Sequence, residues 1–424
     1  MVKISVSEIF NKKGNVELYG WVHDLRDLSK IRFIVLKDIT GRVQCVAIKG
    51  ETTEKVFDSI SNLSRESVIR VNGQIKDSKQ APGGKEILIK DLEVISFAEQ
   101  PLPLDVSDHS KTELPKRLDY RFLDFHREKI QAIFKIQNEI SNSFREYFYQ
   151  LGFIEMQPPC VISASSEGGT DLFSVQYFEK KAYLAQSPQL YKQMIACSLG
   201  KTFMITPVWR AEKHNTTRHI NEIRQMDIEA AFTNQMDIMK YVEEVVQYIV
   251  KNVIKKCEKE LKILNVKIKV PKAVYLSYED AIKKVGGKIG EDFSPEQERK
   301  LGDMYPDSIV FTYSWPSSIK PFYIMTKDAD KNSKFSEGFD ALYGGIEICS
   351  GGQRIHIPEL LIERLKAKGL NPKNFTSYVD SFRYGAPPHS GWSIGLERLT
   401  QIICGLDNIK EATMFPRDRD RLTP

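Results

Sequence analysis

The chain has 424 residues, and its 61 lysines and arginines against 56 aspartates and glutamates give a formal net charge of +5. Hydrophobic residues make up 41% and charged residues 28%, a globular composition that excludes disordered, collagen-like and disulfide-scaffold proteins. The small positive surplus permits a nucleic-acid partner without requiring one.

The sequence gives no sign of a membrane or secreted protein. No apolar run approaches the roughly 20 residues that span a bilayer, and the first residues, MVKISVSEIFNKKG, lack the apolar stretch of a signal peptide. The six cysteines form no CxxC pair, which favours free and mostly buried thiols over a zinc or redox site. We therefore expect a cytoplasmic protein without a membrane segment.

The first hundred residues predict a small β-barrel. Five runs rich in β-branched residues lie at 16–21, 32–36, 43–48, 68–75 and 86–95, separated by turn signals. A helical stretch at about 52–63 falls between the third and fourth runs. Five short strands with a helix after the third are typical of an OB-type barrel, so we assign residues 1–100 to such a domain.

Prolines 101, 103 and 115 and a lack of periodicity predict a hinge over residues 101–127. Residues 128–424 then mix helical and strand patterns. Helices are expected at 128–151, 187–200, 234–261, 358–369 and 395–405, and strands at 182–185, 203–209, 227–232, 309–313, 322–325, 345–349 and 382–384. With no βαβ rhythm, no GxGxxG and no GxxxxGK[ST], this predicts an α+β fold with an antiparallel sheet flanked by helices.

The densest group of reactive side chains lies between residues 206 and 229, where two strand patterns enclose a polar hairpin. It includes Arg210, Glu212, Arg218 and His219. A guanidinium fork suits phosphate or carboxylate, so two arginines beside carboxylates can clamp a polyphosphate. The alternative is a solvated hairpin whose ion pairs contribute about 0–1 kcal/mol each, and the charge pattern alone leaves both open.

A second segment, GFDALYGGIEICSGGQRIH, carries hard-oxygen groups. Asp340, Glu347 and Ser350 are the oxygen types that Mg²⁺ takes when it also binds nucleotide phosphates. The glycines that follow Ser350 allow a substrate to approach the backbone closely, and Arg354 follows them. A glycine-rich turn between strands is the alternative.

A third segment, GWSIGLER, predicts a glycine-flanked strand that ends near Gly395 and leads into a helix whose first turn carries Glu397 and Arg398. An arginine there can stack on a base and reach a phosphate. Taken alone, however, this segment is better explained by an ion pair at the start of a helix.

A fourth pair of segments has the charges that an amino-acid site requires. Glu167 lies in a glycine-rich loop, and Gln189 and Lys192 share one face of a predicted helix. The carboxylate suits an ammonium group and the lysine suits a carboxylate. Taken alone, Lys192 is more often a solvated surface residue.

Together these segments resemble the class II aminoacyl-tRNA synthetases, and within them the aspartyl enzymes of the archaeal and eukaryotic-like type, over essentially the whole chain. Motif 1 is similar to the long helix followed by GFIEMQPP, motif 2 to WRAE and its loop, and motif 3 to GWSIGLER. Ser390 and Ser393 stand where the family usually has glycine. The resemblance implies an N-terminal OB barrel that reads the anticodon, a class II catalytic domain, and a homodimer formed through motif 1.

The resemblance also implies roles for individual residues, with Arg210, Glu212 and Arg398 as the catalytic groups. The residues implied to bind ATP are Arg210, Glu212, Arg218, His219, Ile220, Glu347, Gly395 and Arg398. Those implied to bind aspartate are Glu167, Gln189, Lys192, Arg210, Ser350 and Arg354. Those implied to hold Mg²⁺ are Glu347, Ser350 and Asp340. Aspartate would attack the α-phosphate of ATP, and the aspartyl group would then pass to the 3′ end of tRNA(Asp).

We expect the amino-acid side chain to be selected by charge. Lys192 and Arg354 would both face the β-carboxylate of aspartate, and two buried cations around a neutral amide would be poorly compensated, so asparagine should be rejected. Two alternatives remain: an asparaginyl-tRNA synthetase, and a non-catalytic RNA-binding paralogue that uses only its OB domain.

In the barrel, Phe33 is a candidate platform for stacking a base, and burial in the barrel core is its alternative. Arg26 and Gln44 are candidates for contacts with base edges, and His23, Pro82 and Gly83 for the rest of the anticodon site. Family members strict for tRNA(Asp) tend to have tryptophan in place of His23 and a lysine near the APGG turn. We therefore hypothesise that this chain also charges tRNA(Asn).

Overall fold

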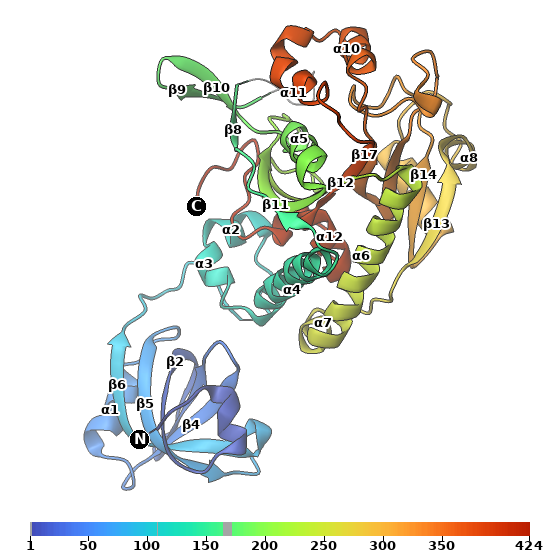
Figure 1. Ribbon diagram of the computed structural model, residues 1–424. Coiled ribbons are helices and arrows are strands. Elements are labelled where there is room, and N and C mark those ends of the chain that lie inside the picture. Colours follow the sequence, from blue (N-terminus) through green and yellow to red (C-terminus); the bar gives the residue numbers. More distant parts are fainter. Residues whose placement is uncertain (1, 108, 164–171) are drawn as a thin grey trace. The chain divides into compact units, whose positions relative to one another are not determined.

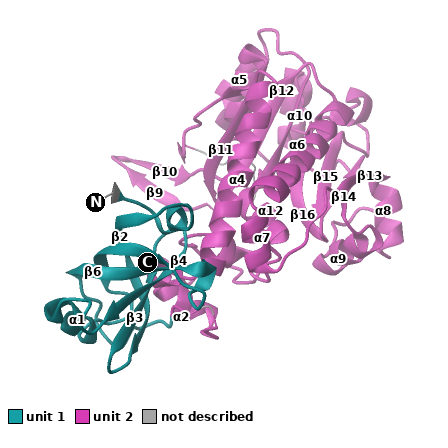
Figure 2. Cartoon of the chain, turned by 90° about the horizontal axis from the view of Figure 1, so that it is seen from below, with its two compact units in different colours: residues 1–105 teal, residues 106–424 magenta. Residues whose placement is uncertain are grey.

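The structure is a computed structural model and describes residues 2–107, 109–163 and 172–424 (Figure 1). The chain divides into two compact units, Met1–Asp105 and Val106–Pro424 (Figure 2). Each unit is built around hydrophobic clusters of its own.

The first unit is a closed barrel. Its elements are β1 (Val2–Lys3), η1 (Val6–Asn11), β2 (Gly14–Asp27), β3 (Ile31–Lys37), β4 (Arg42–Ile48), α1 (Glu54–Ser61), β5 (Val68–Asp77), η2 (Pro82–Gly84) and β6 (Lys85–Ser96). The strand order is β1-β2-β3-β4-β6-β5, and the pairing of β5 back onto β2 closes the sheet. The five predicted strands and the helix after the third are confirmed, as is the OB-type barrel.

Alternation along the strands explains why these residues form a barrel. On β3, Ile34 and Leu36 are fully buried, while Phe33 and Val35, which alternate with them, are partly exposed. On β4 the partner of Ile34 is Cys45, which is also fully buried. Because side chains on a strand alternate between the two faces, these residues form the inner layer of the barrel.

The segment predicted as a hinge is partly helical. It contains α2 (Leu114–Asp119) and α3 (Arg121–Asp124). Arg121 is fully buried and donates hydrogen bonds to the carboxylate of Asp124 and to the backbone carbonyls of Glu411, Thr413 and Met414. The second half of the predicted hinge is therefore folded onto the second unit, because its arginine satisfies carbonyls near the end of the chain.

The second unit is built on an eight-stranded sheet with the order β13-β14-β15-β16-β17-β12-β11-β7. These strands are β7 (Ile154–Glu155), β11 (Lys201–Trp209), β12 (Glu222–Ala231), β13 (Lys272–Ser277), β14 (Ser308–Tyr313), β15 (Gly338–Tyr343), β16 (Ile346–Gln353) and β17 (His389–Gly395). All neighbours are antiparallel except β7–β11 and β13–β14. A small separate sheet holds β8 (Val161–Ile162), β9 (Ser174–Tyr177) and β10 (Lys180–Leu184). The predicted antiparallel sheet flanked by helices is confirmed.

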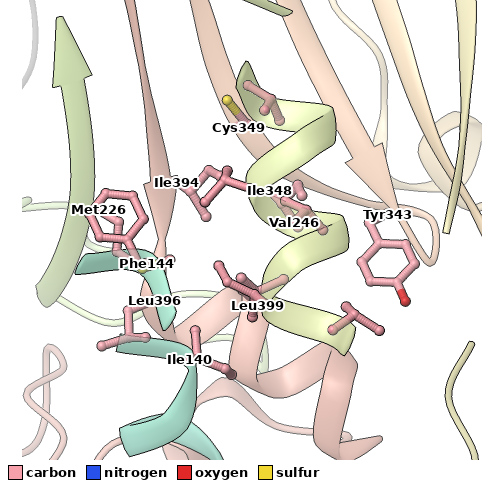
Figure 3. Packing of buried hydrophobic residues seen from close by; sticks show 14 of the residues in the cluster. Ile140, Phe144, Met226, Val246, Tyr343, Ile348, Cys349, Ile394, Leu396 and Leu399 are labelled. Atoms are coloured by element: carbon pink, nitrogen blue, oxygen red, sulfur yellow. The ribbon is translucent and has the colours of Figure 1, made fainter. Parts of the chain in front are cut away.

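Three helices pack on one face of this sheet: α4 (Glu128–Gln150), α6 (Gln235–Lys256) and α12 (Leu396–Cys404). Figure 3 shows Phe144 of α4, Val246 of α6 and Leu399 of α12 beside Met226 and Ile394 of the sheet. The other helices are α5 (Gln189–Leu199), α7 (Glu258–Leu264), α8 (Tyr278–Lys284), α9 (Pro295–Met304), α10 (Pro358–Ala367) and α11 (Thr376–Ser381), and η3 (Lys327–Ala329), η4 (Pro372–Phe375) and η5 (Ile409–Ala412) are short turns of 3₁₀ helix. Among the described residues, none of the helices combines the length and apolarity needed to cross a membrane.

The long helix α6 starts where its sequence favours a start. The side chain of Asn234 accepts hydrogen bonds from the backbone of Met236 and Asp237, and the Asp237 carboxylate bonds back to the backbone N–H of Asn234. This capping box satisfies donors that the first turn leaves open. The single helix predicted for 234–261 is wrong in one respect, because α6 ends at Lys256 and α7 begins after Cys257.

Two predicted strands are also wrong. In 322–325 only Ile324 forms an isolated bridge, with Arg354, and 382–384 is a turn that follows α11. Phe322 and Phe382 instead belong to a small hydrophobic cluster with α10 and α11. A short apolar run has no periodicity that separates a strand from a buried turn, so the pattern was ambiguous at both places.

Replacing Ile249 by alanine is expected to lower the free energy of unfolding by about 2–5 kcal/mol, because a fully buried side chain is lost and a cavity remains. The same change at Ile254, which is 37% exposed on the same helix, is the control and should cost less than about 1 kcal/mol. Urea unfolding followed by tryptophan fluorescence measures both. Equal losses of unfolding free energy in the Ile249 and Ile254 variants would contradict the burial of Ile249 against the sheet.

Candidate active site

The face of the sheet opposite α4, α6 and α12 carries polar side chains. Along β12, Met226 and Ile228 point into the helical core, so Gln225, Asp227 and Glu229 point to the other face. A cavity of ≈ 340 Å³ lies over this face, with Gln225 of β12, Ser350 of β16 and Ser393 of β17 in its wall.

Most of the predicted site residues of this unit line that one cavity. They are Gln189, Arg210, Glu212, Arg218, His219, Ile220, Glu347, Ser350, Arg354, Gly395 and Arg398. Lys192 and Asp340 lie behind the wall, both buried. Glu167 lies outside the described residues.

The predicted polar hairpin is the loop between β11 and β12. The two strands pair without a break from Trp209 and Glu222 to Lys201 and Ala230. Asn221 closes the loop: its carbonyl accepts from the N–H of Arg210 at 2.9 Å, and its side-chain amide donates to the carbonyls of Arg210 and Glu212 at 2.6 and 2.9 Å. The backbone of the two candidate catalytic residues is thus fixed by an asparagine that the motif analysis did not single out.

The two outer arginines of the cavity are held by groups far apart in the sequence. Arg218 donates to the carboxylate of Glu298 on α9 at 3.2 Å, and Arg398 donates to the backbone carbonyl of Glu347 at 2.8 Å. Burial, reinforced by the charge of Glu347, raises the pKa of Glu298 to about 7. Sequence reasoning missed Glu298 because the segment around it carries no motif and its partner lies 80 residues earlier.

The three oxygen residues predicted to hold Mg²⁺ lie on the adjacent strands β15 and β16. Asp340 and Ser350 are direct partners in the pairing, and Glu347 lies three residues before Ser350 on β16. Lys320 donates to both carboxylate oxygens of Asp340 at 2.6 Å. Desolvation by the surrounding side chains, and next the negative charge of Asp340, raise the pKa of the Glu347 carboxyl group.

This donor set fits a hard divalent cation, because two carboxylates and a hydroxyl supply only oxygen. The two carboxylates are not equivalent. Lys320, 8% exposed, already neutralises Asp340, whereas the side chain of Glu347 is 39% exposed and lies in the cavity wall. Glu347, whose carboxylate lies 3.9 Å from the guanidinium of Arg398, is therefore the more accessible of the two carboxylates, and Asp340 lies behind it.

Beneath the cavity lies a cluster of four buried charges. Lys192 donates to Asp227 at 2.6 Å and lies 3.6 Å from Glu229, and Arg354 donates to Glu229 at 2.9 and 3.3 Å. All four side chains are at most 3% exposed. Lys192 and Arg354 are therefore not the two uncompensated cations expected to reject asparagine, since each already has a carboxylate partner.

The comparisons with known proteins agree with this geometry. Residues 113–419 match the tRNA synthetases class II (D, K and N), and residues 16–95 match the OB-fold nucleic acid binding domain. The chain belongs to the class II tRNA synthetases of the D, K and N group. This family membership confirms the resemblance that the motifs indicated.

Two relatives are named aspartate–tRNA(Asp/Asn) ligase. The one from Methanocaldococcus jannaschii is 44% identical over 96% of this chain and 94% of its own, and the one from Archaeoglobus fulgidus is 43% identical over 96% of both. Among solved structures, the asparaginyl-tRNA synthetase from Pyrococcus horikoshii complexed with asparaginyl-adenylate covers all of both chains with a TM-score of 0.92 and 33% identity. A putative aspartyl-tRNA synthetase from Leishmania major Friedlin covers all of this chain and 94% of its own, with a TM-score of 0.92 and 28% identity.

In this synthetase, the two serines at which we expected glycine from the resemblance make hydrogen bonds. Ser393 donates to Asp227 at 3.2 Å, and Ser390 donates to the carbonyl of Thr233 at 2.7 Å. Gly391 between them has no such freedom, because a Cβ there would lie 2.0 Å from the carboxylate of Glu229. The two serines therefore lie where a side chain fits, and Gly391 lies where the carboxylate of Glu229 fills the space that a Cβ would need.

Three of the candidate residues of the barrel, Arg26, Phe33 and Gln44, share its outer face. In the pairing of β2, β3 and β4, Arg26 is opposite Phe33, and Gln44 is opposite Val35, two residues along the same face of β3. Phe33 therefore lies outside the barrel, and its alternative as a core residue is wrong. Gln44 donates to Glu86 at 2.9 Å.

His23 lies where the pairing of β2 with β3 shifts by one residue, between Val22 and Asp24. Such a bulge redirects the side chain of the extra residue. The Nδ1 atom of His23 is buried and has no hydrogen-bond partner among the described residues. Pro82 and Gly83 form the short η2 turn between β5 and β6.

Replacing Lys192 by methionine is expected to lower the free energy of unfolding by about 3–5 kcal/mol, because Asp227 would remain buried without its partner. Lys262→Met is the matched control. Its ion pair with Glu258 is 74% and 71% exposed, so the loss should be about 0–1 kcal/mol. Thermal unfolding of the full chain compares the two. Similar losses would mean that the buried pair is not formed.

Proposed function

We propose that the chain is an aspartate–tRNA ligase that activates L-aspartate with ATP and transfers the aspartyl group to the 3′ end of tRNA(Asp). The observation that carries this proposal is the convergence of Arg210, Arg218 and Arg398 with Glu347 in one cavity, which Arg354 also lines and behind which Lys192 is buried. Such a cavity suits a polyphosphate at one end and a dicarboxylic amino acid at the other. The relatives named aspartate–tRNA(Asp/Asn) ligase support the same assignment.

In the proposed first step, the α-carboxylate of aspartate attacks the α-phosphate of ATP, and pyrophosphate leaves. Arg210 would neutralise the charge that develops on the α-phosphate, Glu212 and His219 would orient the nucleotide, and Arg398 would hold its outer phosphates. Bound Mg²⁺ would add charge neutralisation, held by Glu347 and Ser350 with Asp340 behind them. The cavity offers positioning and charge, and the proposed chemistry needs no side-chain nucleophile.

In the second step, the ribose hydroxyl at the 3′ end of the tRNA attacks the aspartyl carbonyl, and AMP leaves. The OB barrel would bind the anticodon through the outer face that carries Phe33, Arg26 and Gln44, because every base has a face that can stack on an aromatic ring. His23 and the Pro82–Gly83 turn complete the proposed anticodon site.

Replacing Arg210 by glutamine is expected to lower aspartate-dependent ATP–pyrophosphate exchange by at least about 100-fold, the usual cost of removing a group that stabilises developing charge. Arg383→Gln, an exposed arginine that pairs with Asp380, is the control and should leave the rate unchanged. Exchange that depends on asparagine rather than aspartate would favour the asparaginyl alternative, and no exchange with either would favour the non-catalytic paralogue.

We also propose that the enzyme is non-discriminating, so that both purified tRNA(Asp) and purified tRNA(Asn) are aspartylated. His23→Trp should lower kcat/KM for tRNA(Asn) about tenfold or more relative to tRNA(Asp), the size of one base contact. Aspartate-dependent exchange, which needs no tRNA, is the internal control and should not change. Failure of the unmodified chain to aspartylate tRNA(Asn) would contradict the proposal that the enzyme is non-discriminating.

A homodimer through motif 1 is part of the proposal. The end of α4 and the neighbouring edge strand β7 expose the apolar side chains Tyr149, Leu151 and Ile154, which are 54%, 37% and 48% exposed. Adjacent exposed apolar side chains at the edge of a sheet suit burial against a second copy. A cytoplasmic location is proposed with it, on the support of six cysteines that are all free.

A further inference from the structure

A second cavity lies in the same unit, away from the proposed active site. It has a volume of ≈ 570 Å³ and is bounded by α10 and by the segments around Ser317 and Lys334. Its wall contains the cations Lys334, Arg364 and Lys368, and no aspartate or glutamate is among its lining residues. It shares no lining residue with the active-site cavity.

Two of these cations lie side by side without a counter-ion. Arg364 and Lys368 are one helical turn apart, and each donates to a neighbouring carbonyl: Arg364 to Ser317 at 2.7 Å and Lys368 to Ser318 at 2.6 Å. Neither forms an ion pair with an aspartate or glutamate of the described residues. Burial lowers the pKa of both groups, and the charge of Arg364 lowers that of Lys368 further.

Two of the residues that line this cavity, Arg364 and Ser317, carry a polar atom without a partner in the part of the chain that the structure describes. Nε of Arg364 and the hydroxyl of Ser317 are buried and have no hydrogen-bond partner among the described residues, and Ser317 is 4% exposed. Buried donors are nearly always paired, and buried charges are nearly always compensated. One ligand that brings both negative charge and acceptor oxygens would satisfy both requirements.

We propose that this cavity is a binding site for a phosphate group or an equivalent oxyanion. The oxygens would accept from Arg364 Nε and from the hydroxyl of Ser317, and Lys368 and Lys334 would supply further charge. A guanidinium beside an ammonium and a hydroxyl is a donor set that suits phosphate. The group can come from a free anion such as inorganic phosphate or from the backbone of an RNA, and the two sources share this chemistry.

Equilibrium binding of radiolabelled inorganic phosphate to the full chain tests the proposal, with a non-hydrolysable ATP analogue present to fill the active-site cavity. One phosphate per chain should remain bound under these conditions. Arg364→Gln should weaken its binding at least tenfold. Lys366→Gln, an exposed lysine of the same helix, is the matched control and should bind phosphate as the unmodified chain does.

Ser317→Ala is the second variant, because it removes the hydroxyl without altering α10, and it should weaken phosphate binding severalfold. A short RNA duplex added to the bound complex separates the sources: displacement of phosphate identifies RNA backbone as the occupant, and retention identifies a free anion. Absence of phosphate binding with the active site filled, or equal binding by Arg364→Gln and Lys366→Gln, would overturn the proposal. Aspartate-dependent ATP–pyrophosphate exchange is measured separately, so a failure of the proposed ligase activity can be told apart from a failure of phosphate binding at the second cavity.

Discussion

The constraint on which the catalytic unit depends is the burial of four charges in the middle of its sheet. Lys192 and Arg354 are brought from α5 and from the end of β16 onto Asp227 and Glu229 of β12. None of the four tolerates burial alone, so their partners fix the positions of the elements that carry them. The adjacent strand β17 must accommodate the cluster, which is why it has a glycine opposite Glu229 and a serine opposite Asp227.

This balance changes how amino-acid selection has to be understood. The cluster is neutral before any ligand arrives, so an aspartate side chain adds a charge rather than completing a pair. In the proposed function, selection would depend on which donors of Arg354 and Lys192 remain free to face the cavity, and Arg354 lines the cavity whereas Lys192 does not. The same framework can serve a carboxylate or an amide with small changes, which is consistent with close structural similarity to both aspartyl and asparaginyl enzymes.

Local patterns were enough to predict the strands of the barrel, the β11–β12 hairpin and the β17–α12 junction, because alternation and turn residues are visible within each short segment. The ion pairs of Lys192 with Asp227 and of Lys320 with Asp340 could not be predicted in the same way. Their partners are 35 and 20 residues apart and meet only when the sheet is assembled. The sequence patterns indicated Lys192, Asp340 and the segment 206–229 that contains Asp227, and not Lys320, which lies outside all of the motif segments.

Lys320 also shows how one short segment serves two parts of the catalytic unit. Residues 316–321 contribute Ser317 and Ser318 to the wall of the second cavity and Lys320 and Pro321 to the wall of the first. The ammonium of Lys320 neutralises Asp340 and lies 4.1 Å from the centre of the Trp315 ring, so its position depends on the path of this segment. The other end of the same segment is held by α10, because the carbonyls of Ser317 and Ser318 accept hydrogen bonds from Arg364 and Lys368, so this segment of six consecutive residues forms part of both cavity walls.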